Sequence, residues 1–318
     1  MFTTREVVLV APGKVEIRER EIEPGLGQVV LKVEACGVCA WEARHVYRNG
    51  ELPYPRALGH EACGIVVGVG PDVKAFSVGD KVTGLFQPGF ATYTVADANL
   101  LVKIPADLDL ELAIAEPVKC VVTSLRAAPV EPGDVVAVVG CGFMGLLVAC
   151  ALASNRFTRV ICIDVNESRV AFTRKLGIQD AVLANSPELD AVVKRLTHGR
   201  GVDLVFETSG VPSGFDTAVS ILKKGRGRMV FVSYPNSRNG YQLTTACDQS
   251  CVISFTHPSF STNPMDDLER AVRGLEARIF DMGRLITHRF PLSKAAEAMD
   301  LCLDPPPGFI KAIVKPWL

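Results

Sequence analysis

The stretch that decides the fold of this chain is VVAVVGCGFMG, residues 135–145. Five consecutive apolar residues are typical of a strand that is buried on both faces, and a G-x-G-x-x-G pattern follows them directly. Gly140 lets the chain turn tightly, Gly142 lets a pyrophosphate approach the backbone, and Gly145 lets the next helix pack closely. The N-terminus of that helix offers free N–H groups and a partial positive charge to a phosphate. The stretch therefore predicts a strand, a turn and a helix that bind a dinucleotide.

The next apolar run supports this prediction. Residues 160–163, VICI, predict a second strand, which ends at Asp164, 19 residues after the last glycine. A carboxylate at this place accepts hydrogen bonds from the adenosine ribose hydroxyls and would repel a 2′-phosphate, so NAD is favoured over NADP. Arg169 could accept a phosphate, but we expect Asp164 to dominate. Phe143 and Met144, at the start of the helix, complete the expected cofactor-binding set.

The pattern around this site divides the chain into three segments. Residues 125–257 alternate strand-like runs with helix-length segments, which predicts a doubly wound parallel sheet with helices on both faces. Residues 1–124 read as short strands separated by Pro-Gly and Gly-Asp turns, which is typical of a small barrel or sandwich. Residues 258–318 return to a mixed pattern. We therefore expect fold class α/β plus β, with a dinucleotide-binding domain inserted into a β-rich domain that the last segment completes.

Composition excludes several classes of function. The chain has 318 residues, about two domains' worth, and its 48% hydrophobic and 22% charged residues exclude disorder over most of its length. Lysine and arginine total 34 against 35 acidic residues, so no basic excess indicates nucleic acid or an anionic membrane as a partner. No apolar run is long enough to span a bilayer and the first residues lack a signal-peptide pattern, so we expect a cytoplasmic protein. Most of the ten cysteines lie in apolar surroundings and are expected to be buried thiols.

Residues with metal-ligating side chains occur in three separate stretches. Residues 36–39, CGVC, by themselves fit half a zinc knuckle, a redox pair or two buried thiols. No second C-x-x-C pair is present in the sequence, so a structural zinc held by four cysteines is not expected. His60 and Glu61 follow 21 and 22 residues after Cys39, and Glu116 lies shortly before the α/β segment.

These stretches, in this order, resemble the zinc-dependent medium-chain dehydrogenases, the family of alcohol, sorbitol and threonine dehydrogenases. The likeness runs nearly from end to end. The segments that carry it are residues 35–39 (ACGVC), 59–64 (GHEACG), 78–82 (VGDKV), 115–117 (AEP), 201–210 (GVDLVFETSG) and 285–292 (LITHRFPL). The resemblance implies a GroES-like β-barrel catalytic domain, residues 1–124 and 258–318, with an inserted Rossmann domain, residues 125–257.

The resemblance also assigns roles to individual residues. Cys39, His60 and Glu116 would hold one catalytic zinc, and Glu61 would be the nearby carboxylate that binds zinc directly when water leaves. This set leaves a position open for water or substrate, as a catalytic zinc requires. Zinc would stabilise an alkoxide, which then releases hydride to the nicotinamide. A cluster of ionisable ligands without a metal would be costly to bury, which agrees with this assignment.

Several positions depart from the family pattern or add to it. Trp41 stands where the family usually has the Ser or Thr that passes on the alcohol proton, and an indole N–H cannot relay a proton. The relay is therefore absent, or Glu42 or His45 replaces it; Trp41 could equally be a wall of the substrate pocket. Glu42 could also support the zinc histidine as a hydrogen-bond acceptor. Lys119, one helical turn after the third ligand, could bind a substrate anion, donate a proton or simply lie at the surface.

We therefore expect an enzyme that transfers hydride between NAD and a secondary alcohol of polyol, sugar or amino-alcohol type. Residues 84–92 pass straight through the place of the family's structural-zinc lobe, so one zinc per chain is expected. Two alternatives stay open, namely reduction of a C=N or C=C bond with NADH or NADPH, and a catalytically inactive nucleotide-binding protein. Because the family pairs open sheet edges, we expect a homodimer or homotetramer, with residues 228–234 as the edge.

Overall fold

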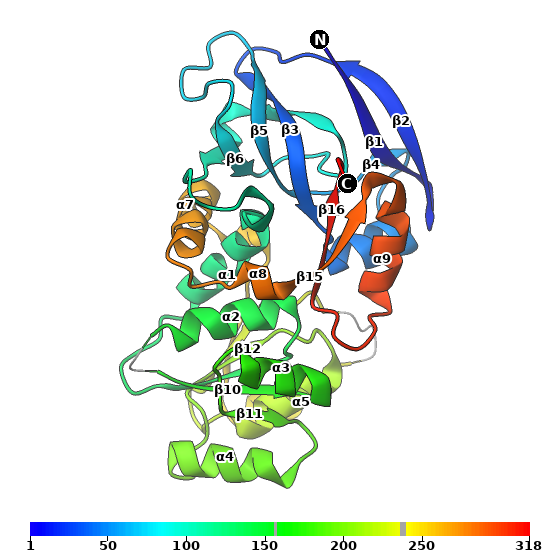
Figure 1. Ribbon diagram of the computed structural model, residues 1–318. Coiled ribbons are helices and arrows are strands. Elements are labelled where there is room, and N and C mark those ends of the chain that lie inside the picture. Colours follow the sequence, from blue (N-terminus) through cyan, green and yellow to red (C-terminus); the bar gives the residue numbers. More distant parts are fainter. Residues whose placement is uncertain (156–157, 236–239) are drawn as a thin grey trace. The chain divides into compact units, whose positions relative to one another are not determined.

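The computed structural model describes residues 1–155, 158–235 and 240–318, and the chain forms two compact units (Figure 1). Unit 1 comprises Met1–Lys119 and Met265–Leu318, and unit 2 comprises Cys120–Pro264. The sequence-based division at 124/125 and 257/258 differs from these boundaries by 5 and 7 residues. Helix α1 (Ala115–Ala127) runs from the first part of unit 1 into unit 2, and the segment after unit 2 returns to unit 1.

Unit 2 is built on a six-stranded parallel sheet in the order β11-β10-β9-β12-β13-β14. Its strands are β9 (Val135–Val139), β10 (Arg159–Asp164), β11 (Ala181–Leu183), β12 (Leu204–Glu207), β13 (Arg228–Phe231) and β14 (Val252–Phe255). Its helices are α2 (Phe143–Ala153), α3 (Glu167–Lys175), α4 (Pro187–Thr197), α5 (Pro212–Ile221), α6 (Leu243–Asp248) and the 3-10 turn η4 (Pro258–Phe260). The strand order reverses direction between β9 and β12, and open α/β sheets bind ligands beyond the carboxyl ends of the strands at such a point. The expected doubly wound sheet is confirmed.

Both faces of β9 are buried, as its uninterrupted apolar sequence predicts. Val135, Ala137 and Val139 belong to a buried cluster to which α4 and α5 contribute. Val136 and Val138 point to the opposite face and have no exposed surface. The strand that precedes the glycine turn is therefore fixed by packing on both sides.

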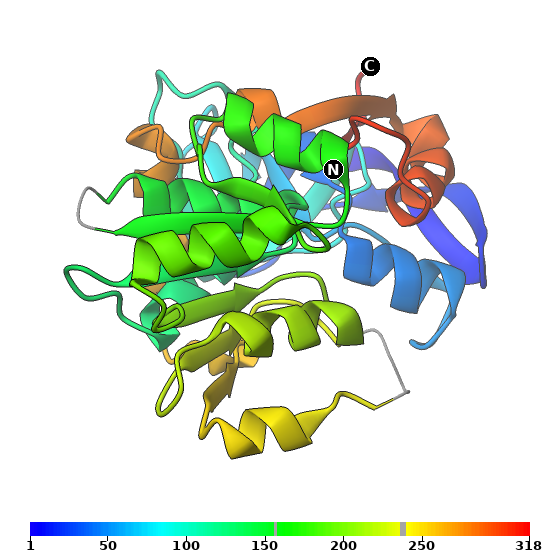
Figure 2. The same ribbon diagram turned by 90° about the horizontal axis from the view of Figure 1, so that it is seen from below.

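The edge of this sheet differs from the expectation. Strand β13 pairs with β12 on one side and with β14 on the other, so residues 228–234 are not an open edge and that prediction is wrong. The edge strand beyond β13 is β14, which lies with α6 (yellow) at one side of the sheet (Figure 2), and β11 is the edge strand at the other side. The four-residue sequence of β14, VISF, was too short to stand out as a strand. Val252 and Phe255 on this edge are 51% and 58% exposed.

Unit 1 is a β-rich unit with two sheets. One sheet follows the order β15-β16-β3-β5-β6-β8, with β7 also paired to β3, and the other has the order β2-β1-β4. The strands are β1 (Phe2–Ala11), β2 (Lys14–Ile22), β3 (Gln28–Gly37), β4 (Arg56–Ala57), β5 (Glu61–Val69), β6 (Lys81–Gly84), β7 (Tyr93–Asp97), β8 (Leu101–Lys103), β15 (Ile286–Pro291) and β16 (Lys311–Lys315). Because β16 pairs antiparallel with the end of β3, the last segment of the chain lies beside the residues around Cys39.

Most helices of unit 1 are short, and one of them has an unusual form. They are η1 (Glu42–Arg48), η2 (Ala98–Leu100), η3 (Leu110–Leu112), α7 (Pro264–Glu276), α8 (Met282–Leu285), η5 (Leu292–Lys294) and α9 (Ala295–Leu303). The element η1 is a π-helix, a form often found at functional sites, and nothing in the sequence indicated it. Arg48 at its end forms ion pairs with Asp300 and Asp304, which fasten η1 to the α9 region. Among the described residues, no helix is both long enough and apolar enough to cross a bilayer.

Candidate active site

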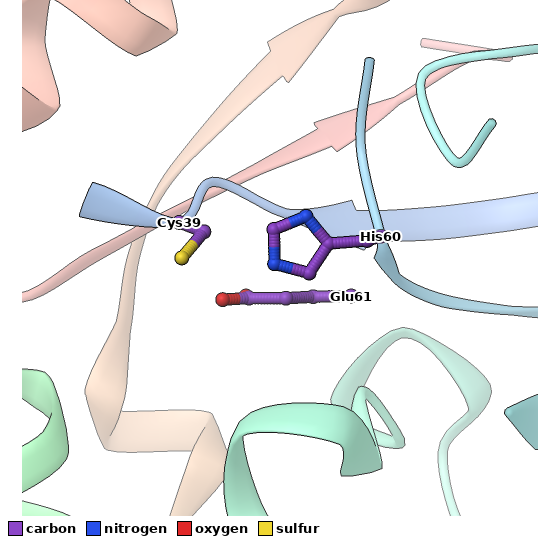
Figure 3. Close-up of side chains that lie close together, drawn as sticks. All are labelled: Cys39, His60 and Glu61. Atoms are coloured by element: carbon purple, nitrogen blue, oxygen red, sulfur yellow. The ribbon is translucent and has the colours of Figure 1, made fainter. Parts of the chain in front are cut away.

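Three side chains with metal-ligating atoms converge in unit 1. Cys39, His60 and Glu61 each place one ligand atom within 4.8 Å of those of the other two, and their side chains point toward one another (Figure 3). The pairing of β3 with β5 brings them together, because Gly37, at the end of β3, lies opposite Glu61, at the start of β5. Cys39 follows the one strand and His60 precedes the other, so both lie at the same end of the pair.

Glycine makes room for this arrangement. A Cβ on Gly37 would lie 2.0 Å from Glu61 Oε2, so any larger residue would displace the carboxylate. Gly59, just before the histidine, has φ +87°, and a Cβ there would lie 2.5 Å from the backbone nitrogen of Phe90. Gly37 and Gly59 therefore leave the space that the site residues need.

The Glu42 carboxylate contacts both the His60 ring and the backbone of the preceding residue. The Glu42 side chain is buried, and its two oxygens accept the Gly59 backbone N–H at 3.1 and 3.2 Å. Its Oε1 lies 3.4 Å from His60 Nδ1. A carboxylate on one ring nitrogen orients a histidine and leaves the other nitrogen for a metal. Glu42 therefore lies where it could support His60, as the sequence suggested.

The charge balance of the site suits a divalent cation. Burial lowers the pKa of His60, but hydrogen bonds with Cys39 and Glu42 outweigh burial and, when no metal is bound, raise the pKa to about 12. The imidazole therefore holds a proton between a sulfur and a carboxylate. A thiolate, an imidazole and a carboxylate are the donor types that Zn²⁺ binds in proteins, and three such ligands leave a coordination position open. The residues present fit a catalytic zinc.

Lys311 is a component that sequence reasoning missed. This buried lysine places its Nζ 2.6 Å from Glu61 Oε2 and donates a hydrogen bond to the Val38 carbonyl at 2.8 Å. Burial lowers the pKa of Lys311, but the negative charges of Glu61 and Cys39 outweigh burial and raise it above its ordinary value. The sequence signal was only a lysine at the start of an apolar strand, residues 311–314 (KAIV). Lys311 therefore ties Glu61 to the residue just before Cys39.

The other residues predicted for this site do not belong to the converging group. Glu116 is half-buried in the first turn of α1, and Lys119 is buried one turn later. Glu116 is outside the group of described ligand atoms that lie within 4.8 Å of one another. The Trp41 and His45 rings stack at 5.8 Å between centroids, and His45 Nδ1 lies 2.9 Å from Glu51 Oε2. The roles of these four residues stay predictions.

In unit 2 the glycine turn is shaped as its sequence predicts. Gly140 has φ +101° and donates its N–H to the Ile163 carbonyl at 2.8 Å. A Cβ on Gly145 would lie 1.8 Å from the Gly140 oxygen, so only glycine permits this close packing. A Cβ on Gly142 would meet no atom within 4 Å, which leaves the backbone open to a ligand at the start of α2, where Phe143 and Met144 follow. The turn fits a pyrophosphate.

Asp164, the last residue of β10, is hydrogen-bonded to the glycine turn. Its Oδ2 accepts the Cys141 N–H of the glycine turn at 2.6 Å, and its Oδ1 accepts the Asn166 N–H at 2.8 Å. Arg169 Nη1 lies 3.8 Å from Asp164 Oδ2. The carboxylate is therefore fixed at the carboxyl end of β10, next to the turn, where a ribose would reach it.

Comparisons with known proteins agree with both units. Residues 25–106 match a family model described as alcohol dehydrogenase GroES-like domain, and residues 144–262 match one described as zinc-binding dehydrogenase. An L-threonine 3-dehydrogenase of Bacillus subtilis is 29% identical, covering 86% of this chain and 87% of that protein. A sorbitol dehydrogenase of Bacillus subtilis is 26% identical, covering 99% and 96%. The crystal structure of galactitol-1-phosphate dehydrogenase from Escherichia coli has the same fold, with a TM-score of 0.85 at 23% identity over 98% of this chain and 100% of that one.

Proposed function

Because the chain belongs to the zinc-dependent medium-chain dehydrogenase family, we propose that it transfers hydride between a secondary alcohol and NAD. The observation that carries this proposal is the convergence of Cys39, His60 and Glu61 within 4.8 Å. When bound there, zinc supplies a Lewis acid that stabilises negative charge on the substrate oxygen. Cys39 and His60 hold the ion, Glu42 fixes the tautomer of His60, and Glu116 is proposed as a further ligand.

The Glu61 carboxylate of the same site is held in place by an ion pair with Lys311. Glu61 is close enough to belong to the ligand group, but its Oε2 is engaged by Lys311. We infer that Lys311 limits the approach of Glu61 and so keeps a position open for the substrate oxygen. One zinc per chain is part of this proposal.

His45 is the better candidate for moving the alcohol proton outward. Both oxygens of Glu42 accept the Gly59 N–H, so that carboxylate is committed to structure. His45, in contrast, contacts Glu51, whose side chain is 46% exposed and leads to water. An imidazole can accept one proton while it donates another, as a relay requires. Lys119 remains a proposed contact for a charged substrate group.

The nucleotide is proposed to bind along the glycine turn of unit 2. The open space over Gly142 would receive the pyrophosphate, and Asp164 would accept hydrogen bonds from the ribose hydroxyls. Asp164 opposes a 2′-phosphate, which supports NAD, and Arg169 is the residue through which NADP would be accepted.

The substrate is proposed to be a polyol, a sugar or an amino alcohol with a secondary hydroxyl. The names of the relatives, threonine and sorbitol dehydrogenases, support this class. We also propose a cytoplasmic enzyme that forms dimers or tetramers through the exposed edge of β14. Small molecules, rather than nucleic acid or membranes, are its proposed partners.

The test combines metal analysis with a substrate panel. Purified protein is assayed for zinc content and for NAD⁺-dependent oxidation of polyols, sugar alcohols and amino alcohols, with and without a chelator. Cys39→Ser and His60→Ala should lose both zinc and activity, whereas Cys247→Ser, at an exposed cysteine of unit 2, should keep both. Full activity in zinc-free protein would refute the proposal. Activity only on C=N or C=C substrates would support the reductase that Trp41 leaves open.

A further inference from the structure

A buried glutamate and the turn that follows it, at the carboxyl end of β12, have no part in the chemistry described so far. Glu207, the last residue of β12, has no exposed surface and lies opposite Val139, the last residue of β9. Thr208, Ser209 and Gly210 follow it. This segment therefore borders the glycine turn at the switch point of the sheet, where a nucleotide is expected.

Thr208 fastens this segment to the glycine turn. Its backbone N–H donates to the Val139 carbonyl at 2.9 Å. Its hydroxyl lies 2.9 Å from the Val139 carbonyl and 2.6 Å from the Gly140 carbonyl, so one proton is shared between two acceptors. A Cβ would lie 2.8 Å from Thr208 Oγ1 if added to Gly140, and 2.6 Å if added to Gly145. The first and third glycines of the motif therefore also leave room for this hydroxyl.

Glu207 in turn fixes the backbone that carries Thr208. Its Oε1 accepts the Ser209 N–H at 2.8 Å and the Gly210 N–H at 3.2 Å, and the Ser209 hydroxyl donates to it as well. Its Oε2 accepts the Gly210 N–H at 3.2 Å and the hydroxyl of Ser233, which follows β13. The carboxylate thus closes the turn after β12 and links it to the next strand.

We propose that Thr208 and Glu207 are positioning residues for the dinucleotide, acting through the glycine turn rather than by touching the cofactor. Glu207 holds residues 208–210 in one conformation, and Thr208 then holds the Gly140 carbonyl. The backbone at the start of α2 is thereby kept in the conformation that receives the pyrophosphate before it arrives. A preformed site loses less conformational entropy on binding, so it binds more tightly. This inference rests on the proposed nucleotide function.

The first experiment removes only the hydroxyl. Thr208→Val has nearly the same shape and lacks the donor, and Thr208→Ser restores the donor. NADH and adenosine are titrated into the full-length protein, because adenosine reaches the Asp164 end but has no pyrophosphate. We expect Thr208→Val to weaken NADH binding about three- to tenfold, the range that one hydrogen bond carries, with adenosine unchanged and Thr208→Ser close to wild type.

The outcomes separate this inference from the proposed function. Wild-type protein that fails to bind NADH contradicts the proposed function itself. Wild-type binding with an equal affinity in Thr208→Val overturns the inference alone. Equal losses for NADH and adenosine also overturn it, because they would show a general loss of structure instead of a role at the pyrophosphate.

A second pair of variants tests Glu207. Glu207→Gln keeps an oxygen for the two N–H groups, and its amide can donate to the Ser233 hydroxyl, so we expect NADH affinity within about threefold of wild type. Glu207→Met leaves those buried N–H groups unpaired and should lose NADH affinity selectively. If Glu207→Met does not fold, Ser233→Ala loosens the same carboxylate and should weaken NADH binding about two- to threefold. Unchanged NADH binding in a folded Glu207→Met, or in Ser233→Ala, overturns the role of Glu207.

Discussion

Replacing Glu42 by glutamine tests how far the zinc site depends on a residue that does not bind the metal. Glu42→Gln keeps the size of the side chain but removes the charge beside His60. Loss of such a supporting carboxylate typically weakens metal binding 10- to 100-fold. The Glu42 Oε1 to His60 Nδ1 distance of 3.4 Å is long for a hydrogen bond, which places the expected loss near the lower end. We expect about a tenfold loss of zinc affinity, or about 1.4 kcal/mol.

The assay is competition for zinc with a chromogenic chelator, followed by its absorbance. Glu51→Gln is the matched control, because it changes an exposed carboxylate beside His45 and should leave zinc affinity unchanged. Glu42→Ala should add a loss of about 1–3 kcal/mol in unfolding free energy, because the Gly59 N–H is left buried without an acceptor. Wild-type zinc affinity in both Glu42 variants would show that this carboxylate does not support the metal ligand.

Four further predictions concern other parts of the structure. Zinc affinity should rise with pH between 7 and 9 in a chelator titration, because zinc displaces the proton that His60 holds with a pKa of about 12; a flat profile would contradict this. Lys311→Met should lower the unfolding free energy in urea by about 3–5 kcal/mol, since it strands the buried Glu61 charge, and Glu61→Gln in the same chain should recover part of it. Gly145→Ala should lower the melting temperature and abolish NADH binding, because its Cβ has no space; normal binding would refute the close packing. Phe255→Lys, on the exposed edge of β14, should shift the protein toward monomer in size-exclusion chromatography, and an unchanged elution volume would exclude that edge as the interface.

Much of unit 2 could be predicted from short stretches of its sequence. The apolar run before Gly140 and the helix after it could be read directly, because strand burial and the glycine turn depend on neighbouring residues. Asp164 could be placed by its spacing for the same reason. The edge strand β14 could not be predicted. Its four residues have no strong pattern, and they form a strand only because they pair with β13.

Only part of the candidate metal site could be predicted from the sequence. The resemblance pointed to Cys39, His60 and Glu61, but their convergence depends on the register between β3 and β5. The π-helix that carries Glu42 has no sequence signature. Lys311 could not be linked to Glu61 from sequence, because their contact exists only through the pairing of β16 with β3.

The return of the chain to unit 1 has a consequence for biosynthesis. Val38 and Lys311, joined by a hydrogen bond, are 273 residues apart, and all of unit 2 is translated between them. At 5–20 residues per second, the ribosome needs about 14 to 55 s to cover that distance. During this interval the nascent chain exposes the end of β3 without its neighbour β16, while unit 2, encoded without interruption, can finish folding. The metal centre is therefore one of the last parts of the molecule to mature, and truncated translation products would contain a nucleotide unit without a completed zinc site.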